Sequence, residues 1–194
     1  MGRETSIMLF IGAAAKSGTH YTTEFLNRLG IRVGHEYPSF DGMVSWYCYG
    51  APNDYPNQYQ FNQDECICLH QVREPLTCIS SIMRLDDQSW RYIRRWMQMD
   101  LTRPLLERSM EYYYHWNKNL ENCTFTYPVE EIEDLIEILD LFDVEYDRTK
   151  IDWALQTPRL GLTNNKIQLT WEDLFNENFF LANCISASAE IYGY

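Results

Sequence analysis

Apolar runs and helical patterns alternate along this chain. Four runs are short enough to be strands, at 6–11, 31–33, 65–69 and 123–126. Elsewhere apolar side chains recur at the three- and four-residue spacing of amphipathic helices, in segments 21–29, 76–85, 89–97, 104–120 and 130–142. Strands that alternate with helices in this way are typical of a parallel sheet. The pattern therefore predicts an α/β fold of three layers, in which helices flank a central parallel sheet.

Residues 37–63 interrupt the pattern. Proline, glycine and asparagine recur through this segment, and its aromatic side chains are Tyr37, Phe40, Trp46, Tyr47, Tyr49, Tyr55, Tyr59 and Phe61. A loop of this length inside a compact domain is usually a lid or a binding loop, although a loop that packs on itself would look the same. Because aromatic rings offer flat, rigid contact area, we expect an aromatic-rich loop that contacts a small molecule.

The first apolar run passes directly into a loop of small residues. The segment reads Gly12-Ala13-Ala14-Ala15-Lys16-Ser17-Gly18-Thr19, and a predicted helix follows it. A strand, a loop and a helix in this order aim backbone N–H groups at one point, which is typical of a phosphate site. Nucleoside triphosphate loops read G-x-x-x-x-G-K-[ST], with lysine after the last glycine, whereas here Lys16 precedes Gly18. The segment thus predicts a P-loop-like architecture that serves a different phosphate-bearing donor.

A second cationic segment follows the third apolar run. Arg73-Glu74-Pro75 stands where phosphoryl-transferring P-loop enzymes usually place a magnesium-binding aspartate. Pro75 is expected to begin a helix that brings Ser80 and Ser81 close to Arg73. A guanidinium and a hydroxyl together suit a phosphate group, although Arg73 could instead pair with a carboxylate such as Glu74. Two cationic sites without an evident metal ligand predict a donor that carries phosphate at two ends.

The bulk composition narrows the possible functions. The 194 residues are most simply one domain, 1–194, and a formal net charge of −12 argues against a nucleic-acid partner. No apolar stretch is long enough to predict a membrane span, and no signal peptide is visible. The cysteines contain no C-x-x-C pair, so we expect reduced thiols, no metal and a cytoplasmic location. They are Cys48, Cys66, Cys68, Cys78, Cys123 and Cys184.

The two cationic segments together resemble a known family. Lys16-Ser17-Gly18-Thr19 looks like the 5′-phosphosulfate loop of sulfotransferases that use 3′-phosphoadenosine 5′-phosphosulfate, and Arg73-Glu74-Pro75 with Ser81 is similar to their 3′-phosphate site. The segments Val33-Gly34-His35-Glu36, with Gly42 and Trp46 after it, and Leu169-Thr170-Trp171-Glu172-Asp173-Leu174 resemble bacterial-type members. The chain departs from animal cytosolic members because it is shorter and lacks their C-terminal glycine-rich segment.

The resemblance implies a role for each of these residues. Lys16 would neutralise charge on the leaving nucleotide, and the residues around it would hold the donor: Ser17, Gly18, Thr19, His20, Tyr21, Arg73 and Ser81. The acceptor hydroxyl must lose a proton, for which we select Glu36 as general base and His35 as the second choice. The product nucleotide would be 3′,5′-bisphosphoadenosine.

Three readings of the sequence stay open. The first is transfer of a sulfuryl group to a hydroxyl of a phenolic, glycan or lipid small molecule. The second is a P-loop kinase of nucleotides or small metabolites, against which the placement of Lys16 and Arg73 counts. The third is a catalytically inactive protein that binds a nucleotide, which retention of both cationic segments makes less attractive.

Overall fold

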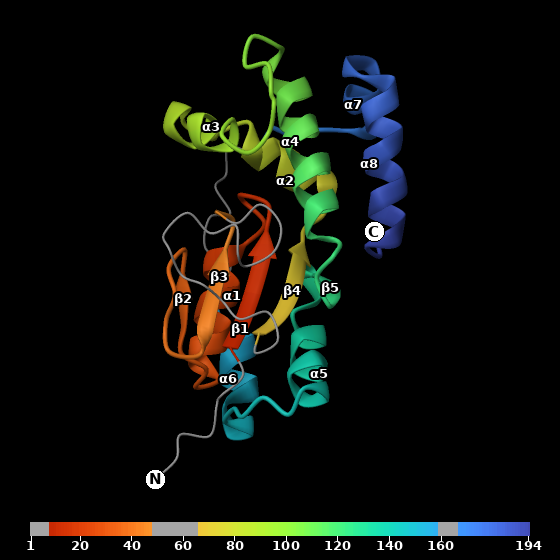
Figure 1. The fold of residues 1–194 in the computed structure, drawn as a ribbon. Helices are drawn as coiled ribbons and strands as arrows, with labels where there is room; N and C mark the ends of the chain where they lie inside the picture. Colours follow the sequence, from red (N-terminus) through yellow and green to blue (C-terminus); the bar gives the residue numbers. More distant parts are fainter. Residues whose placement is uncertain (1–7, 48–65, 159–166) are drawn as a thin grey trace.

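The computed structural model describes residues 8–47, 66–158 and 167–194. Within them, five strands form one parallel sheet in the order β2-β3-β1-β4-β5 (Figure 1). The strands are β1 (Met8–Ala13), β2 (Val33–His35), β3 (Gly42–Ser45), β4 (Cys66–Val72) and β5 (Phe125–Pro128). The predicted α/β fold with a central parallel sheet flanked by helices is confirmed.

Two cores hold the helices to this sheet. On one face, α1 (Thr19–Arg28), α5 (Glu133–Leu141) and α6 (Ile151–Leu155) cover an apolar cluster built around Phe25, Leu69 and Leu135. The second core lies beyond the ends of the strands, around Tyr112 and Trp116. It joins α2 (Pro75–Ile82), α3 (Asp87–Ile93), α4 (Leu105–Leu120), α7 (Trp171–Glu177) and α8 (Phe179–Ile191).

Helix α4 connects this second core to the sheet. It contacts β1 and β4 on the face opposite α1, and α8 packs on its outer side. Its Trp116 donates a hydrogen bond from Nε1 to the carbonyl oxygen of Ala13, 3.0 Å away. Its Tyr112 hydroxyl accepts one from the backbone N–H of Ala15, 2.8 Å away. Helix α4 therefore supports the loop that leaves β1, where the sequence predicts a phosphate site.

Strand β3 is a correction to the predicted loop 37–63. Residues 42–45 pair with β1 on one side and β2 on the other, so the described part of this segment contains a central strand. The rest of the predicted loop lies outside the described residues. Strand β3 escaped prediction because it has only four residues and stands in a segment rich in turn formers.

The connection from β2 to β3 has six residues, fewer than the dozen or so that join most parallel strands. Such a short return is possible because β2 spans only three residues. The chain reverses at Glu36, which adopts a left-handed conformation with φ 63°. Gly42 then enters β3 with φ 138°, and its backbone lies against β1. This tight turn places the Glu36 carboxylate at the carboxyl end of the sheet.

Gly42→Ala should destabilise the fold strongly. An added Cβ would lie 1.8 Å from the backbone oxygen of Leu9, which belongs to β1 and cannot move aside cheaply. We expect the free energy of unfolding to fall by about 3 kcal/mol or more. Gly30→Ala is the matched control, because Gly30 also has a positive φ but its Cβ would meet no atom within 4 Å. Urea unfolding that shows equal losses for the two variants would contradict this account.

Strand β4 also carries a fully buried histidine. His70 Nε2 lies 3.1 Å from the Asn117 side-chain oxygen, and Nδ1 lies 3.2 Å from the Thr126 hydroxyl. The amide oxygen can only accept, so Nε2 carries the proton and Nδ1 accepts from Thr126. Burial lowers the pKa of His70 to about 4. His70 is therefore a neutral structural residue of the sheet.

His70 should make the fold sensitive to acid. The unfolded chain takes up a proton on this residue below its ordinary pKa of 6.5, whereas the folded protein does so only near pH 4. Stability is thus fully present above pH 6.5 and falls as pH falls through this window, by about 3 kcal/mol in total. We expect His70→Gln to lose less stability than wild type between pH 7 and pH 4.5 in urea unfolding. Equal losses in the two proteins would exclude this role.

Candidate functional site

A cleft of about 590 Å³ opens at the carboxyl ends of β1, β2 and β4. This is the edge at which open α/β sheets usually bind ligands. Most of the residues predicted from the sequence line it: Lys16, Gly18, Thr19, His20, His35, Glu36, Arg73 and Ser81. The other two predicted residues, Ser17 and Tyr21, do not line the cavity. The structure thus brings both cationic segments and both candidate bases to one cavity.

The loop between β1 and α1 curls tightly, and the N–H of Ser17 donates back to the Ala14 carbonyl oxygen at 3.2 Å. Lys16 has φ 69° and Gly18 has φ 91°, so two of its residues take the left-handed conformation. Alternation of this kind forms a concave set of backbone donors that suits an anion. Helix α1 begins at Thr19, and Gly18 at its N-cap offers no side chain to accept from the first turn. The helix N-terminus therefore adds further donors and a partial positive charge.

Ser17 and Gln71 support the loop from beneath. The Ser17 side chain is fully buried, with Oγ 3.5 Å from Cys78 Sγ, and its carbonyl oxygen accepts from Gln71 Nε2 at 2.7 Å. Gln71 Oε1 in turn accepts from the hydroxyls of Thr22 and Tyr127 at 2.5 and 2.8 Å. The Ser17 hydroxyl is therefore turned away from the cleft, and its backbone N–H and carbonyl oxygen bond to Ala14 and Gln71. Sequence reasoning missed Gln71, because its partners come from the loop after β1, from α1 and from β5.

Tyr21 likewise points away from the cleft. Its ring packs in the core between α1 and the sheet and is 7% exposed. Because Tyr21 follows two residues after the helix start, its side chain falls on the face that α1 turns to the sheet. Like the Ser17 hydroxyl, the Tyr21 side chain does not line the cleft.

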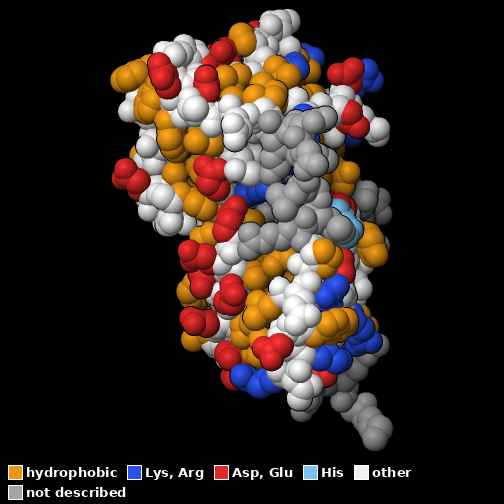
Figure 2. Space-filling view, turned by 180° about the vertical axis from the view of Figure 1, so that it is seen from behind, with side chains coloured by type: hydrophobic (Ala, Val, Ile, Leu, Met, Phe, Trp, Pro, Cys, Tyr) orange, Lys and Arg blue, Asp and Glu red, His pale blue; other side chains and the backbone are white. Residues whose placement is uncertain are grey.

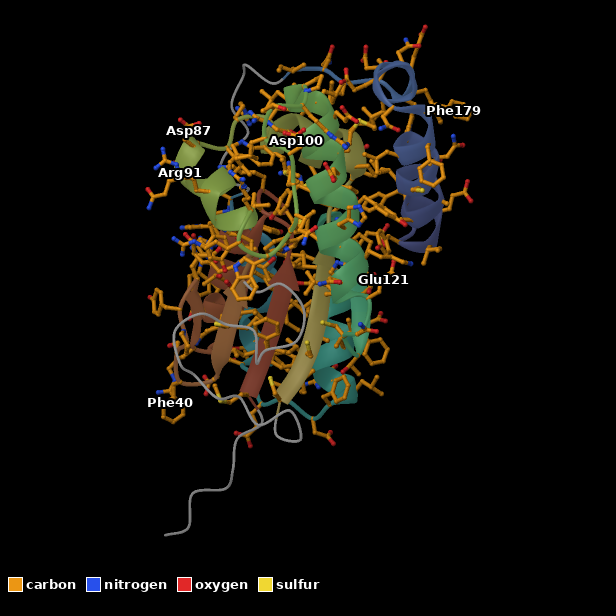
Figure 3. The ribbon with its side chains drawn as sticks, turned by 45° about the horizontal axis from the view of Figure 1, so that its top comes forward. Phe40, Asp87, Arg91, Asp100, Glu121 and Phe179 are labelled. Atoms are coloured by element: carbon orange, nitrogen blue, oxygen red, sulfur yellow. The ribbon has the colours of Figure 1, made fainter. Side chains whose placement is uncertain are left out.

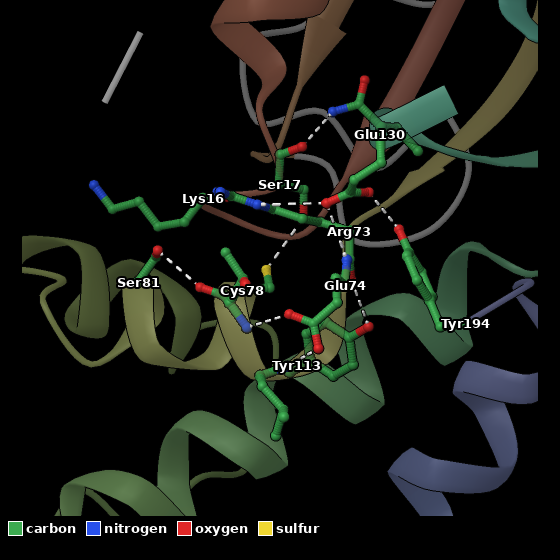
Figure 4. A network of polar contacts seen from close by, with 12 residues as sticks. Lys16, Ser17, Arg73, Glu74, Cys78, Ser81, Tyr113, Glu130 and Tyr194 are labelled. Carbon is green, nitrogen blue, oxygen red and sulfur yellow. Dashed lines mark hydrogen bonds and ion pairs between the residues drawn. The ribbon is translucent and has the colours of Figure 1, made fainter. Parts of the chain in front are cut away.

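Arg73 joins the second cationic segment to the first. It follows β4, and its Nη1 donates a 2.6 Å hydrogen bond to the carbonyl oxygen of Lys16 (Figure 4). The Tyr113 hydroxyl from α4 donates to the Arg73 carbonyl oxygen at 3.0 Å. The alternative partner Glu74 instead caps α2, where its carboxylate accepts from the N–H groups of Leu76 and Thr77. Arg73 is thus oriented by backbone contacts toward the loop.

Glu130 and Tyr194 extend this network beyond the cleft. Glu130 Oε1 lies 3.9 Å from Arg73 Nε, and Oε2 accepts a 2.6 Å hydrogen bond from the Tyr194 hydroxyl (Figure 4). Burial, and then the bond to Glu130, raise the pKa of Tyr194 above its ordinary value, so the phenol stays a donor. The sequence gives no signal for this contact, because Tyr194 reaches the site only after α8 has packed against α4.

Ser81 lies on α2 at the edge of the cleft. Its hydroxyl donates to the Thr77 carbonyl oxygen at 2.9 Å, a bond within the helix that leaves the oxygen able to accept. The neighbouring Ser80 hydroxyl donates to the carbonyl oxygen of Ile167 instead. Of the two predicted serines, Ser81 alone lines the cavity with Arg73.

His35 and Glu36 meet Thr19 across the cleft. His35 Nε2 lies 3.0 Å from Thr19 Oγ1 and 3.2 Å from Glu36 Oε1. Glu36 Oε2 accepts from the Ser45 hydroxyl at 2.7 Å and from the Trp46 backbone N–H at 3.2 Å. Two donors from the end of β3 therefore hold one carboxylate oxygen, and the other faces Thr19 and His35. The side chains are 14% and 33% exposed for Glu36 and His35.

Aromatic residues of the predicted loop border the cleft only in part. Trp46 lines it and packs against Tyr47 and Tyr92, with ring centroids 4.4 and 5.6 Å away. Tyr37 and Phe40 do not line it and are 62% and 52% exposed. Figure 3 shows Phe40 at the end of the sheet far from α3. The remaining aromatic residues of the predicted loop lie outside the described residues.

The cleft is cationic although the chain is acidic. Acidic side chains spread widely over the face drawn in Figure 2, and the formal net charge is −12. Among the described residues that line the cavity, Lys16, Arg73 and Arg84 are basic and Glu36 is the one acidic residue. Among the described residues, no three His, Cys, Asp or Glu side chains lie close enough to hold a metal ion. No described helix meets the length and apolarity that crossing a bilayer requires.

Comparisons with known proteins give a likeness in structure but none in sequence. No family model and no curated protein matches the chain by sequence. Among solved structures, mouse sulfotransferase SULT7A1 complexed with PAP is similar with a TM-score of 0.46 and 14% identity. The match covers 95% of this chain and 89% of that one. Similarity at this level does not establish a common family.

The side chains of Tyr194 and Glu130 should be energetically coupled to each other. In a double-mutant cycle of Tyr194→Phe and Glu130→Ala, we expect a coupling of about 1 kcal/mol in the free energy of unfolding, because the carboxylate loses a short hydrogen bond. Tyr192→Phe with Glu130→Ala is the control pair, since Tyr192 binds Glu121 instead. Additive effects in both cycles would contradict the assignment.

Proposed function

We propose that this chain is a sulfotransferase, which moves a sulfuryl group from 3′-phosphoadenosine 5′-phosphosulfate to a hydroxyl of a small-molecule acceptor. The observation that carries the proposal is the hydrogen bond from Arg73 to the Lys16 carbonyl oxygen. It joins two cationic segments, 57 residues apart, at the wall of one cleft. A donor with phosphate groups at both ends of an adenosine matches two such sites.

The loop at Lys16 would hold the 5′ end of the donor. The curled backbone and the α1 N-terminus offer N–H groups to the 5′-phosphate, and the Thr19 hydroxyl lies at the same cavity wall. The exposed Lys16 ammonium would approach the bridging oxygen between phosphorus and sulfur. Arg73 and Ser81 would hold the 3′-phosphate through the guanidinium fork and the hydroxyl. Both roles rest on the family resemblance together with this placement.

The reaction needs one bond to form and one to break. The acceptor oxygen would attack sulfur in line, and the bond from sulfur to the bridging oxygen would break. The electron pair of that bond would pass to the 5′-phosphate, where Lys16 neutralises the added charge. The acceptor proton would pass to Glu36, or to His35, which contacts both Glu36 and Thr19. Ser45 and Trp46 hold the Glu36 carboxylate in a single orientation for this task.

Trp46 is the best-placed described side chain for acceptor contact. Its ring lines the cavity beside Glu36, and its neighbours Tyr47 and Tyr92 keep it from turning away. An aromatic face suits a phenolic ring, the apolar face of a sugar or a lipid, so the acceptor class stays open among these.

We further propose that residues 1–194 form a single sulfotransferase domain, which acts in the cytoplasm on a soluble nucleotide.

Calorimetry with 3′,5′-bisphosphoadenosine tests the assignment of the phosphate sites. We expect Lys16→Ala and Arg73→Ala each to weaken binding by about tenfold to a hundredfold, because each removes a charged contact to phosphate. Arg91→Ala is the matched control, since Arg91 points outward from α3 (Figure 3) and should leave affinity unchanged. Wild-type affinity in both phosphate-site variants would reject the proposal, as would preferred binding of ATP with magnesium.

Glu36→Gln separates catalysis from binding. The amide keeps the size of the carboxylate but cannot take the acceptor proton, so turnover should fall by about a hundredfold or more while nucleotide affinity stays near wild type. Release of bisphosphoadenosine from a labelled donor, measured over a panel of phenolic, glycan and lipid acceptors, gives the rate. Full turnover in this variant would remove Glu36 as the base and leave His35. No turnover in the wild type with any acceptor would favour an inactive nucleotide-binding protein.

A further inference from the structure

Two cysteines far apart in the sequence meet beside the sheet. Cys68 lies in β4, and Cys123 lies in the turn between α4 and β5. Their Sγ atoms are 2.8 Å apart, and both side chains are partly exposed. The sequence predicts reduced thiols, and no motif in it brings these two residues together, since 55 positions separate them.

Backbone pairing holds the two thiols together. The Thr124 N–H donates a 2.8 Å hydrogen bond to the Cys68 carbonyl oxygen, and the register of β4 and β5 continues with Leu69 opposite Phe125. This geometry does not depend on the sulfur atoms themselves. The backbone pairing at the start of β5 therefore places the two sulfur atoms side by side.

The residues around Cys68 and Cys123 favour redox chemistry over metal binding. Cys66 shares the same face of β4, but its thiol is directed at the Ile67 carbonyl oxygen, 3.8 Å away. Within the described part of the chain, no group of three metal-binding side chains forms, whereas zinc sites use three or four protein ligands. Two adjacent thiols without further ligands are suited to redox chemistry instead.

We propose that Cys68 and Cys123 are a dithiol site that a small-molecule disulfide, such as glutathione disulfide, converts reversibly to an intrachain disulfide. Cys123 loses its proton to solvent, and its thiolate attacks one sulfur of the small disulfide and expels a thiolate. Cys68 then loses its proton, attacks Cys123 Sγ and expels the second small thiolate. Both expelled thiolates take up protons, so two protein thiols and one disulfide give one protein disulfide and two small thiols.

The order of attack follows from the surroundings of the two sulfurs. The hydrogen bond with Cys123, and then burial, raise the pKa of the Cys68 thiol, so Cys68 keeps its proton while Cys123 reacts first. The second step needs almost no movement, because the two sulfur atoms are already in contact. The bond would tie the turn after α4 to β4, the strand that precedes Arg73, and α4 supports both cationic segments.

Peptide mapping by mass spectrometry tests the site on the whole chain. The protein is equilibrated with mixtures of reduced and oxidised glutathione, remaining thiols are blocked with N-ethylmaleimide, and the digest is compared with and without dithiothreitol. We expect a peptide pair that joins Cys68 to Cys123, lighter by two hydrogen atoms than the separate peptides and lost on reduction. Cys66→Ser and Cys184→Ser should keep this pair, whereas Cys68→Ser and Cys123→Ser should each abolish it.

Either of two results would overturn the proposal. One is the absence of a Cys68–Cys123 peptide pair in wild-type protein at every glutathione ratio. The other is linkage of Cys123 mainly to Cys66 or to another cysteine. Neither result bears on nucleotide binding, and because the wild type alone decides the outcome, a variant that fails to fold does not obscure it.

Discussion

The hydrogen bond between the Arg73 guanidinium and the Lys16 carbonyl oxygen is the contact on which the arrangement of the cleft depends. It joins the ends of β1 and β4, which are neighbours in the sheet, and thereby holds two cationic segments at one cavity wall. A charged donor with a 2.6 Å contact to a carbonyl is among the stronger hydrogen bonds available to a protein. The Tyr113 hydroxyl from α4 bonds to the Arg73 carbonyl oxygen, and Glu130, just after β5, lies beside its guanidinium. Two separate segments therefore contribute to the orientation of Arg73.

Backbone strain is concentrated at the same cavity. Lys16 and Glu36, two of the three non-glycine residues with positive φ in the described part of the chain, both line the cleft. Left-handed backbone is unfavourable for such residues and persists only where the surroundings demand it. At Lys16 it curls the loop between β1 and α1, and at Glu36 it permits the short return from β2 to β3. That return also brings Ser45 and Trp46 to the Glu36 carboxylate.

Local patterns in the sequence were enough to predict the sheet class, the loop at Lys16 and the place of Arg73. These features depend on neighbouring residues: an apolar run, small residues in a turn and a charge at a strand end. Strand β3 could not be predicted, because its four residues are short of the length at which alternation becomes visible. Side-chain directions at Ser17 and Tyr21 were also missed, since the exact start of α1 decides which face each residue occupies.

Contacts between segments far apart in the sequence could not be predicted from the sequence. Gln71 gains its role only when β1, α1 and β5 surround it, and Glu130 meets Tyr194 only after α8 docks on α4. The Cys68–Cys123 contact likewise follows from strand register rather than from any motif. Such features arise from tertiary packing, and no pattern of neighbouring residues in the sequence predicts them.

A crystal structure with bound 3′,5′-bisphosphoadenosine tests the central claim most directly. The account predicts one nucleotide in the cleft, with its 5′-phosphate against the backbone of the Lys16 loop and its 3′-phosphate on Arg73 and Ser81. A nucleotide bound elsewhere, or one whose 3′-phosphate faces away from Arg73, would contradict it.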